Sequence, residues 1–426
     1  MKFIFFQLLL IGIYLPAVCQ NAPTEVAGIP INYDESKVPS YTLPDPLVLQ
    51  NGKKVKDSKT WFKKRRPEIL SLFESEQFGK SPDRNNTSFN VFETGKLAFE
   101  ETAIRKQVTI YFAEDTSNYK ADVLIYLPSK VNKPVPLLLK IGFSPNCLTV
   151  DDPEVKVGMI WTREGKKILA SEARKFGSFD VKKFISKGIG VAFIYYGDIE
   201  PDFPDGIKYG IRGHFLKSGM TEPSPNEWGA ISAWSWGLSC AMDYLQTDQQ
   251  IDSKRIALYG VSRLGKTVLW TGARDERFGL VIASCSGEGG AAISRRQYGE
   301  TIKHMIHPTR YLYQFANNRT KYGDDPNTCP VDAHMLISLI APRPLLLQTG
   351  DTDNWSDPKG EFVAAVAAEP VYELLEKNGL ETEVWPKAGT PILNDLGYYM
   401  HAGGHGPLPE DFDIYLDFLT KHFMEK

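Results

Sequence analysis

Short apolar runs alternate with longer amphipathic segments through most of the chain. Five of the runs carry almost no charge, which is typical of strands buried on both faces of a parallel sheet. They are Val135–Gly142, Gly190–Tyr196, Ile256–Gly260, Leu280–Ser284 and Pro344–Thr349. Further strands are predicted at Ser88–Phe92, Arg105–Phe112, Ala121–Leu127 and Thr382–Trp385.

Segments with apolar residues at helical spacing separate many of these strands. We expect helices at Ser58–Phe78, Ala170–Lys187, Glu227–Leu245, Glu361–Asn378 and Glu410–Phe423, and one that begins directly after Ser262. The alternation favours an α/β fold of three layers, with a mostly parallel central sheet between helices. Residues 301–340 do not fit the alternation and are expected to form an irregular wall of the functional site.

One strand-to-helix junction has the residue pattern of a nucleophile elbow. The apolar run Ile256–Gly260 comes just before Ser262, and Gly265 follows within the helix-compatible segment. Glycines allow the tight turn and the close strand–helix packing that push a serine hydroxyl out of the sheet. An ordinary strand-to-helix turn is the alternative, because the spacing departs from the common G-x-S-x-G pattern.

A serine nucleophile needs a base that takes its proton and an acid that orients the base. In an α/β-hydrolase these partners follow the serine in the order acid, then histidine. The loop Met400–Gly406 lies between the last predicted strand and the closing helix, so His405 is the preferred base. A solvated loop histidine without a role is the alternative.

Three aspartates compete for the acid in the turn Gly350–Asp357, which follows a late buried strand. We favour Asp353, while Asp351 and Asp357 remain open. An Asx-rich turn that caps the next helix accounts for some of them.

Several segments resemble carbohydrate esterase family 15, the glucuronoyl esterases. The family's elbow reads G-x-S-R-x-G-K, and Gly260–Lys266 matches it. Other segments similar to family landmarks are Ser286–Arg296, Ile340–Pro344, Asp353–Trp355 and the Gly404-His405 loop. Together these matches cover the chain from the middle to the closing helix, whereas the N-terminal part carries little recognisable signal.

The resemblance implies an α/β-hydrolase that cleaves esters between glucuronic acid, or its 4-O-methyl form, on xylan and lignin-type alcohols. It also implies a role for each matching residue. The implied catalytic residues are Ser262 as nucleophile, His405 as base, Asp353 as acid and Arg263 as oxyanion donor. The residues implied to contact the uronic-acid ring are Lys266, Glu300 and Trp355. No cofactor and no metal ion are expected.

Two departures from the family pattern affect these implications. Many members carry the acid as a glutamate just before the Ser286–Arg296 stretch, where this chain has Cys285. This departure moves the acid role to Asp353, with Glu288 as a fallback. Residues 305–330 also lack a His-Trp-Phe-containing segment of many members, so the sugar-facing wall is expected to differ.

Two other functions are consistent with the same residues. Because the sugar-facing wall differs, the substrate could instead be another carbohydrate ester, such as acetylated xylan. The chain could also be a secreted glycan-binding protein on a hydrolase scaffold that has lost activity, although the intact Ser262, His405 and Asp353 positions speak against this.

Composition excludes some classes of partner. The chain has 426 residues, 42% hydrophobic and 24% charged, as globular proteins do, and its formal net charge is −3. Without a basic block, a nucleic-acid partner is not expected. We expect a monomer with one catalytic domain over residues 20–426, including an N-terminal extension.

The first 19 residues have the pattern of a signal peptide. Lys2 precedes the apolar run Phe3–Leu15, and Ala17-Val18-Cys19 resembles a cleavage site. Cleavage would give a secreted or periplasmic protein without a membrane span, and a lipid anchor on Cys19 is the alternative. Export would permit disulfides, and the four remaining cysteines allow three complete pairings.

Overall fold

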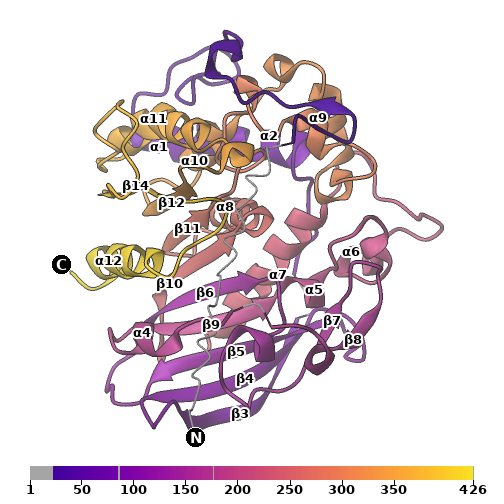
Figure 1. Ribbon diagram of the computed structural model, residues 1–426, viewed down its shortest axis with the longest axis vertical. Coiled ribbons are helices and arrows are strands. Elements are labelled where there is room, and N and C mark those ends of the chain that lie inside the picture. The colour runs from indigo at the N-terminus through magenta and orange to yellow at the C-terminus, as the bar shows by residue number, and fades with distance from the viewer. Residues whose placement is uncertain (1–22, 85–86, 176, 426) are drawn as a thin grey trace, which may run out of the picture.

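A ten-stranded sheet forms the centre of the computed structural model, which describes residues 23–84, 87–175 and 177–425. The predicted signal peptide lies outside these residues. The strand order is β13-β14-β12-β11-β10-β6-β9-β5-β4-β3 (Figure 1). The parallel strands are β6 (Val135–Gly142), β9 (Gly190–Tyr195), β10 (Ile251–Val261), β11 (Leu280–Ser284), β12 (Leu345–Gly350) and β14 (Leu396–His401). Antiparallel pairing at the two ends of the sheet involves β3 (Ser88–Ala98), β4 (Ala103–Tyr111), β5 (Lys120–Pro128) and β13 (Ile392–Leu393).

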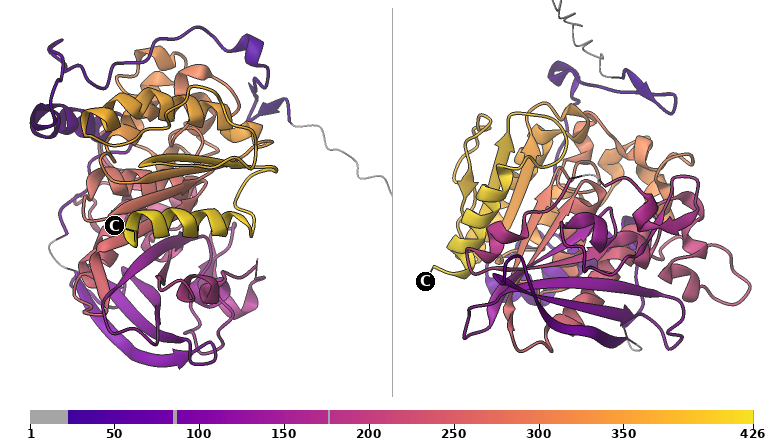
Figure 2. Two further views of the ribbon diagram at one scale, coloured as in Figure 1. Left: turned by 90° about the vertical axis from the view of Figure 1, so that its left-hand side faces the viewer. Right: turned by 60° about the horizontal axis from the view of Figure 1, so that its bottom comes forward.

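Helices cover both faces of this sheet (Figures 1 and 2). One face packs against α2 (Arg66–Glu76), α7 (Ala230–Leu245), α8 (Arg263–Arg274), α10 (Ala333–Ser338) and α11 (Pro358–Leu374). The other face packs against α4 (Val181–Ile185) and α12 (Asp411–Phe423). Shorter elements are α1 (Ser58–Thr60), α3 (Asn146–Thr149), α5 (Tyr196–Ile199), α6 (Ile211–His214), α9 (Ile302–Met305), β1 (Glu25–Val26), β2 (Ile29–Pro30), β7 (Met159–Trp161) and β8 (Lys167–Leu169). The α/β-hydrolase prediction, a three-layer arrangement around a mostly parallel sheet, is confirmed.

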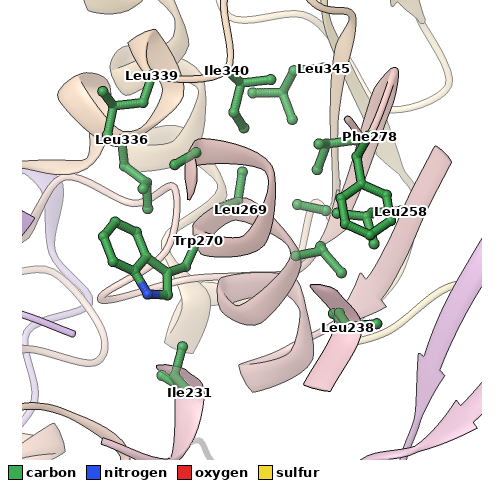
Figure 3. Close-up of a cluster of buried hydrophobic side chains, with 14 of the residues drawn as sticks. Ile231, Leu238, Leu258, Leu269, Trp270, Phe278, Leu336, Leu339, Ile340 and Leu345 are labelled. Carbon is green, nitrogen blue, oxygen red and sulfur yellow. The ribbon is translucent and has the colours of Figure 1, made fainter. Parts of the chain in front are cut away.

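The hydrophobic core holds α8 rigidly against the sheet, which matters because this helix follows Ser262. Leu269 and Trp270 of α8 are fully buried, and they lie among Leu258 of β10, Leu336 of α10 and Ile231 of α7 (Figure 3). Burying an apolar side chain of this size contributes about 1.5–3 kcal/mol. The start of α8 is therefore fixed by packing along the whole helix.

Most predicted elements occur within a few residues of their expected bounds. The runs Val135–Gly142 and Leu280–Ser284 coincide with β6 and β11. The segment Ser88–Phe92 is the beginning of a longer strand, β3, which continues to Ala98. The uncharged runs were informative because strands in the middle of a parallel sheet are buried on both faces.

The helix predicted over Ala170–Lys187 is wrong for most of its length. Among the described residues of this range, only Val181–Ile185 forms an α-helix, and a single 3₁₀ turn covers Ala170–Glu172. Gly177 adopts φ +73°, a conformation that ends any helix, and Asp180 caps the short helix by accepting from the Lys183 N–H at 3.1 Å.

The strand predicted at Thr382–Trp385 is also wrong. This segment has no regular structure, and Val384 is 76% exposed. The last strand is β14, Leu396–His401, in which every residue is buried. Four alternating residues are a weak signal for a strand. The later run Leu396–His401 is more apolar and can be buried, so it forms the strand instead.

Two further expectations concern membranes and disulfides. Across the described ranges, no helix combines the length and apolar character needed to cross a bilayer. The cysteines of these ranges, Cys147, Cys240, Cys285 and Cys329, are all free thiols.

Candidate active site

Ser262 lies between β10 and α8, at the carboxyl edge of the sheet. Its backbone has φ 59° and ψ −126°, a strained conformation for a residue with a side chain. A Cβ at Gly260 would lie 2.2 Å from the Leu264 carbonyl oxygen, and one at Gly265 would lie 2.8 Å from that of Ser284. The backbone therefore has the geometry of a nucleophile elbow and depends on both glycines.

A cavity of about 320 Å³ opens beside Ser262. Its lining contains every side chain that the sequence assigned to chemistry or ring contact. These are Ser262, Arg263, Lys266, Glu300, Asp353, Trp355 and His405. The remaining lining residues are Cys285, Met305, Arg310, Tyr311, Gln314 and Ser356. Residues spread over more than 140 positions of sequence thus meet in one cavity.

His405 lies in the loop after β14, where its ring is held by two side chains. Its Nδ1 is 2.7 Å from Asp353 Oδ2 and 3.2 Å from Ser356 Oγ. The Asp353 carboxylate is 5% exposed, whereas the His405 side chain is 44% exposed. A buried carboxylate at Nδ1 favours the tautomer with the proton on that nitrogen, which leaves Nε2 as a proton acceptor.

Ser262 and His405 line the same cavity, and within the described chain no hydrogen bond joins their side chains. Catalytic hydrogen bonds are commonly long in free enzymes and tighten when substrate binds. Both side chains therefore border one space that a substrate can enter.

The other two aspartates of the turn have different partners. Asp351 accepts a hydrogen bond from the Gly403 N–H at 2.8 Å and so ties the histidine loop to the turn. Asp357 caps α11 by accepting from the Gly360 N–H at 2.9 Å. Of the three, Asp353 is the carboxylate that reaches the His405 ring.

Glu288, the fallback acid, lies in a separate buried network. Its carboxylate pairs with Arg319 and accepts a hydrogen bond from Ser294 Oγ at 3.0 Å. Burial raises the pKa of Glu288 to about 7 in spite of the Arg319 charge. The position just before the glycine-rich stretch, Cys285, does face the site and receives a hydrogen bond from the Gly406 N–H at 3.3 Å.

Arg263, the first residue of α8, is anchored away from the helix by a buried acid. Its guanidinium pairs with Asp202 and lies 4.8 Å from the centre of the Tyr311 ring. Asp202 also accepts hydrogen bonds from Tyr313 Oη and Gln314 Nε2, both at 2.7 Å. Burial is the largest single effect and acts to lower the pKa of Arg263, but Asp202 and the nearby tyrosines together outweigh it, so the pKa is raised and the cation is stabilised.

A second set of charged side chains forms part of the cavity wall. Lys266 is 4% exposed, and burial lowers its pKa, an effect that Glu300 opposes. Glu300 Oε1 accepts a hydrogen bond from Arg310 Nη2 at 2.8 Å. Arg310 Nη1 is buried and has no hydrogen-bond partner among the described residues, so this wall presents several donors and one acceptor.

Trp355 completes that wall as a half-buried ring. The Arg310 guanidinium lies 5.2 Å from the ring centre, and the His304 ring packs edge-on at 5.2 Å. Part of the Trp355 ring packs against these two side chains. The rest of the ring lines the cavity, where a ligand can reach it.

Sequence reasoning missed Asp202, Arg310 and Gln314 as individual residues. Asp202 lies in a Gly- and Pro-rich stretch without periodicity, and nothing in its local sequence distinguishes it from a surface acid. Arg310 and Gln314 belong to the irregular segment that was expected to form a wall of the site. That segment does line the cavity, but its specific side chains had no motif to identify them.

Comparison with known proteins gives consistent matches. A family model described as "Glucuronyl esterase, fungi" matches residues 222–376. The chain is 43% identical to "Carbohydrate esterase MZ0003" from an unknown prokaryotic organism over 399 residues, which cover 92% of each chain. It is 25% identical to a "4-O-methyl-glucuronoyl methylesterase" of Phanerochaete carnosa, over 88% of this chain and 82% of the relative.

A solved structure gives the same match in three dimensions. The glucuronoyl esterase from Solibacter usitatus superposes with a TM-score of 0.86 at 44% identity. The match covers 91% of this chain and 100% of that one. The similarity therefore includes the sheet, the helices on both faces and the loops that carry the cavity.

Proposed function

Because the chain belongs to carbohydrate esterase family 15, the glucuronoyl esterases, we propose that it hydrolyses esters of glucuronic or 4-O-methyl-glucuronic acid on xylan. The reaction uses Ser262, His405 and Asp353 as a triad. The observation that carries this proposal is the 2.7 Å contact between His405 Nδ1 and the buried Asp353 carboxylate, in the cavity that Ser262 also lines.

The first step is acylation of the serine. His405 Nε2 removes the Ser262 proton while Ser262 Oγ attacks the ester carbonyl carbon at C6 of the uronate. Asp353 stabilises the imidazolium that forms. His405 then gives the proton to the departing alcohol, and water releases the uronic acid from Ser262 by the same sequence in reverse.

Negative charge on the carbonyl oxygen requires donors that are already in position. The Arg263 N–H, directly after the nucleophile at the first turn of α8, has no acceptor within the helix. The Arg263 guanidinium, held by Asp202 and Tyr311, supplies a second donor. A preorganised donor of this kind is worth about 3 kcal/mol of transition-state stabilisation.

The sugar ring contacts a second set of side chains in the wall of the cavity. Lys266, Glu300 and the free Nη1 of Arg310 can hydrogen-bond ring hydroxyls, and Trp355 can pack against the apolar face of the ring. Buried charged groups that bond a hydroxyl reject substrates without it, because the partners are then left unpaired. This wall is the basis for selecting a uronate over a simple acetyl group.

We also infer that the chain is exported, because a xylan substrate lies outside the cell. The signal pattern of residues 1–19 supports this inference. The relatives named above carry carbohydrate or glucuronoyl esterase names, which is consistent with an extracellular polysaccharide as substrate.

A substrate panel tests the proposal. We expect kcat/KM for benzyl glucuronate and methyl 4-O-methyl-glucuronate to exceed that for acetylated xylan oligomers and p-nitrophenyl acetate. Faster hydrolysis of acetyl esters would instead support the acetylxylan-type alternative. Binding to glucuronoxylan without turnover of any ester would support the glycan-binding alternative.

A further inference from the structure

Cys285 lies beside the His405–Asp353 pair, and its thiol has no role in the reaction proposed above. Its Sγ, a carboxylate oxygen of Asp353 and a ring nitrogen of His405 all lie within 4.8 Å of one another. The cysteine comes at the end of β11, between the strands that precede Ser262 and Asp353. Thiolate, imidazole and carboxylate are the ligands that Zn²⁺ prefers in proteins.

We propose that Cys285, Asp353 and His405 form a binding site for a thiophilic divalent cation such as Zn²⁺. A fourth position, open to the cavity, is left for water. In a tetrahedral zinc site, bonds of roughly 2.0–2.3 Å place the ligand atoms roughly 3.3–3.6 Å apart. To reach this geometry the His405 ring, which lies in a loop and is 44% exposed, has to move away from Asp353 Oδ2, which lies 2.7 Å from Nδ1.

Two of the three ligands can supply the negative charge that a dication needs, in a cavity that Arg263, Lys266 and Arg310 also line. The Asp353 carboxylate and a Cys285 thiolate together neutralise two positive charges. The carboxyl group of Glu361, which interacts electrostatically with both residues, adds no negative charge near neutral pH, because burial raises its pKa to about 8. The Gly406 N–H, which donates to Sγ at 3.3 Å, only partly offsets the burial that raises the pKa of the Cys285 thiol to about 12, so the cation itself has to displace the thiol proton.

Metal binding at this position has a defined effect on the base. The cation binds the Nδ1 lone pair, so the proton of Nδ1 moves to Nε2, and the Cys285 thiol proton leaves to solvent. His405 with a proton on Nε2 cannot accept the proton of Ser262. The bound cation therefore inhibits the esterase, a consequence that rests on the proposed function, whereas the metal site itself does not.

Titration of the purified chain with Co²⁺ tests the site by a readout that does not depend on catalysis. We expect one equivalent to bind, with a sulfur-to-cobalt charge-transfer band in the near ultraviolet that Zn²⁺ displaces. Cys285→Ser and His405→Gln should each lose the band. Cys329→Ser, which removes another buried thiol, and Ser262→Ala should keep it.

The inference is overturned if no such band forms, if it persists in Cys285→Ser, or if it depends on Cys329. Circular dichroism of each variant separates loss of the site from loss of the fold, and His405→Gln provides a second variant should Cys285→Ser unfold.

Zn²⁺ should also inhibit benzyl glucuronate hydrolysis, and a chelator should restore it. Full activity with the site saturated would refute the inhibition. A chain that shows the band but cleaves no uronate ester would refute the proposed function and leave the metal site standing.

Discussion

At the scale of single residues, environment separates carboxylates that look equivalent in the sequence. Asp351, Asp353 and Asp357 lie within one turn, but each has a different partner. Asp351 accepts from a loop N–H, Asp353 contacts the His405 ring, and Asp357 caps a helix N-terminus. The sequence favoured Asp353 but could not exclude the other two, because the choice depends on where the β14 loop brings the imidazole. The direction of each side chain decides which one can orient the base.

Asp353→Asn should lower kcat for benzyl glucuronate by roughly 10³–10⁴-fold, because the amide no longer holds the Nδ1–H tautomer or stabilises the imidazolium. Asp351→Asn is the matched control, since its side-chain oxygen can still accept from the Gly403 N–H. Steady-state kinetics of both variants check the prediction. Equal losses in the two variants would contradict the assignment of Asp353.

Arg263→Gln should lower kcat by about 10²–10³-fold, because one oxyanion donor is lost from the transition state. The KM for the ester should change little, since the ground-state carbonyl carries less charge. Arg255→Gln removes an arginine from the N-terminal half of β10, where it pairs with Asp252, and serves as the control. A large rise in KM with unchanged kcat for Arg263→Gln would show a binding role instead.

At the scale of elements, the site depends on strands that share one edge of the sheet. Ser262 follows β10, Cys285 follows β11, Asp353 follows β12 and His405 follows β14, and these strands are neighbours in the sheet. The carboxyl ends of parallel strands meet at one edge, so residues far apart in the sequence converge there. The close approach of the two late loops occurs at Gly350, where a Cβ would lie 2.2 Å from the Gly404 carbonyl oxygen.

Gly260→Ala should lower the free energy of unfolding by about 3 kcal/mol or more, because the new methyl group overlaps the Leu264 carbonyl oxygen in a packed turn. Gly404→Ala should cost little, since a Cβ there meets no atom within 4 Å. Chemical denaturation of both variants provides the measurement. Equal stability of the two variants would show that the elbow backbone can relax.

The sequence predicted the central strands and placed Ser262 and Asp353 at the site edge for the same physical reason. A strand inside a parallel sheet must be apolar on both faces, so its pattern is unambiguous, and the residue after it is placed at the site edge. The strand before His405, β14, was not predicted, and His405 was chosen from its loop before the closing helix. Ala170–Lys187 failed because Gly177 and Asp180 interrupt a helical pattern that periodicity alone could not weigh. Asp202 was missed because its partner, Arg263, is distant in the chain, so only the fold brings them together.

At the scale of the whole molecule, several carboxyl groups are buried deeply enough to remain protonated near neutral pH. Burial raises the pKa of Glu361 to about 8, and that of both Glu288 and Asp198 to about 7. In the unfolded chain these groups ionise near pH 4. Between about pH 4 and pH 8 the folded state therefore binds more protons than the unfolded state, and the free energy of unfolding falls as the pH rises.

Thermal unfolding between pH 5 and 8 should show this decline, with up to about 1.4 kcal/mol lost per pH unit for each uncompensated carboxyl group. Glu361→Gln should flatten the slope, because its amide does not ionise and its oxygen can still accept from the Gly287 N–H. Melting temperatures of both proteins across this range check the prediction. An unchanged slope in Glu361→Gln would mean that Glu361 is ionised in the folded state.

Hydrolysis of benzyl glucuronate by the native chain and by Ser262→Ala, measured side by side at equal concentration, tests the central claim most directly. The account predicts that the native chain turns the ester over and that Ser262→Ala loses this activity, because the hydroxyl that attacks the carbonyl is gone. Full activity in Ser262→Ala, with the fold verified by circular dichroism, would contradict it.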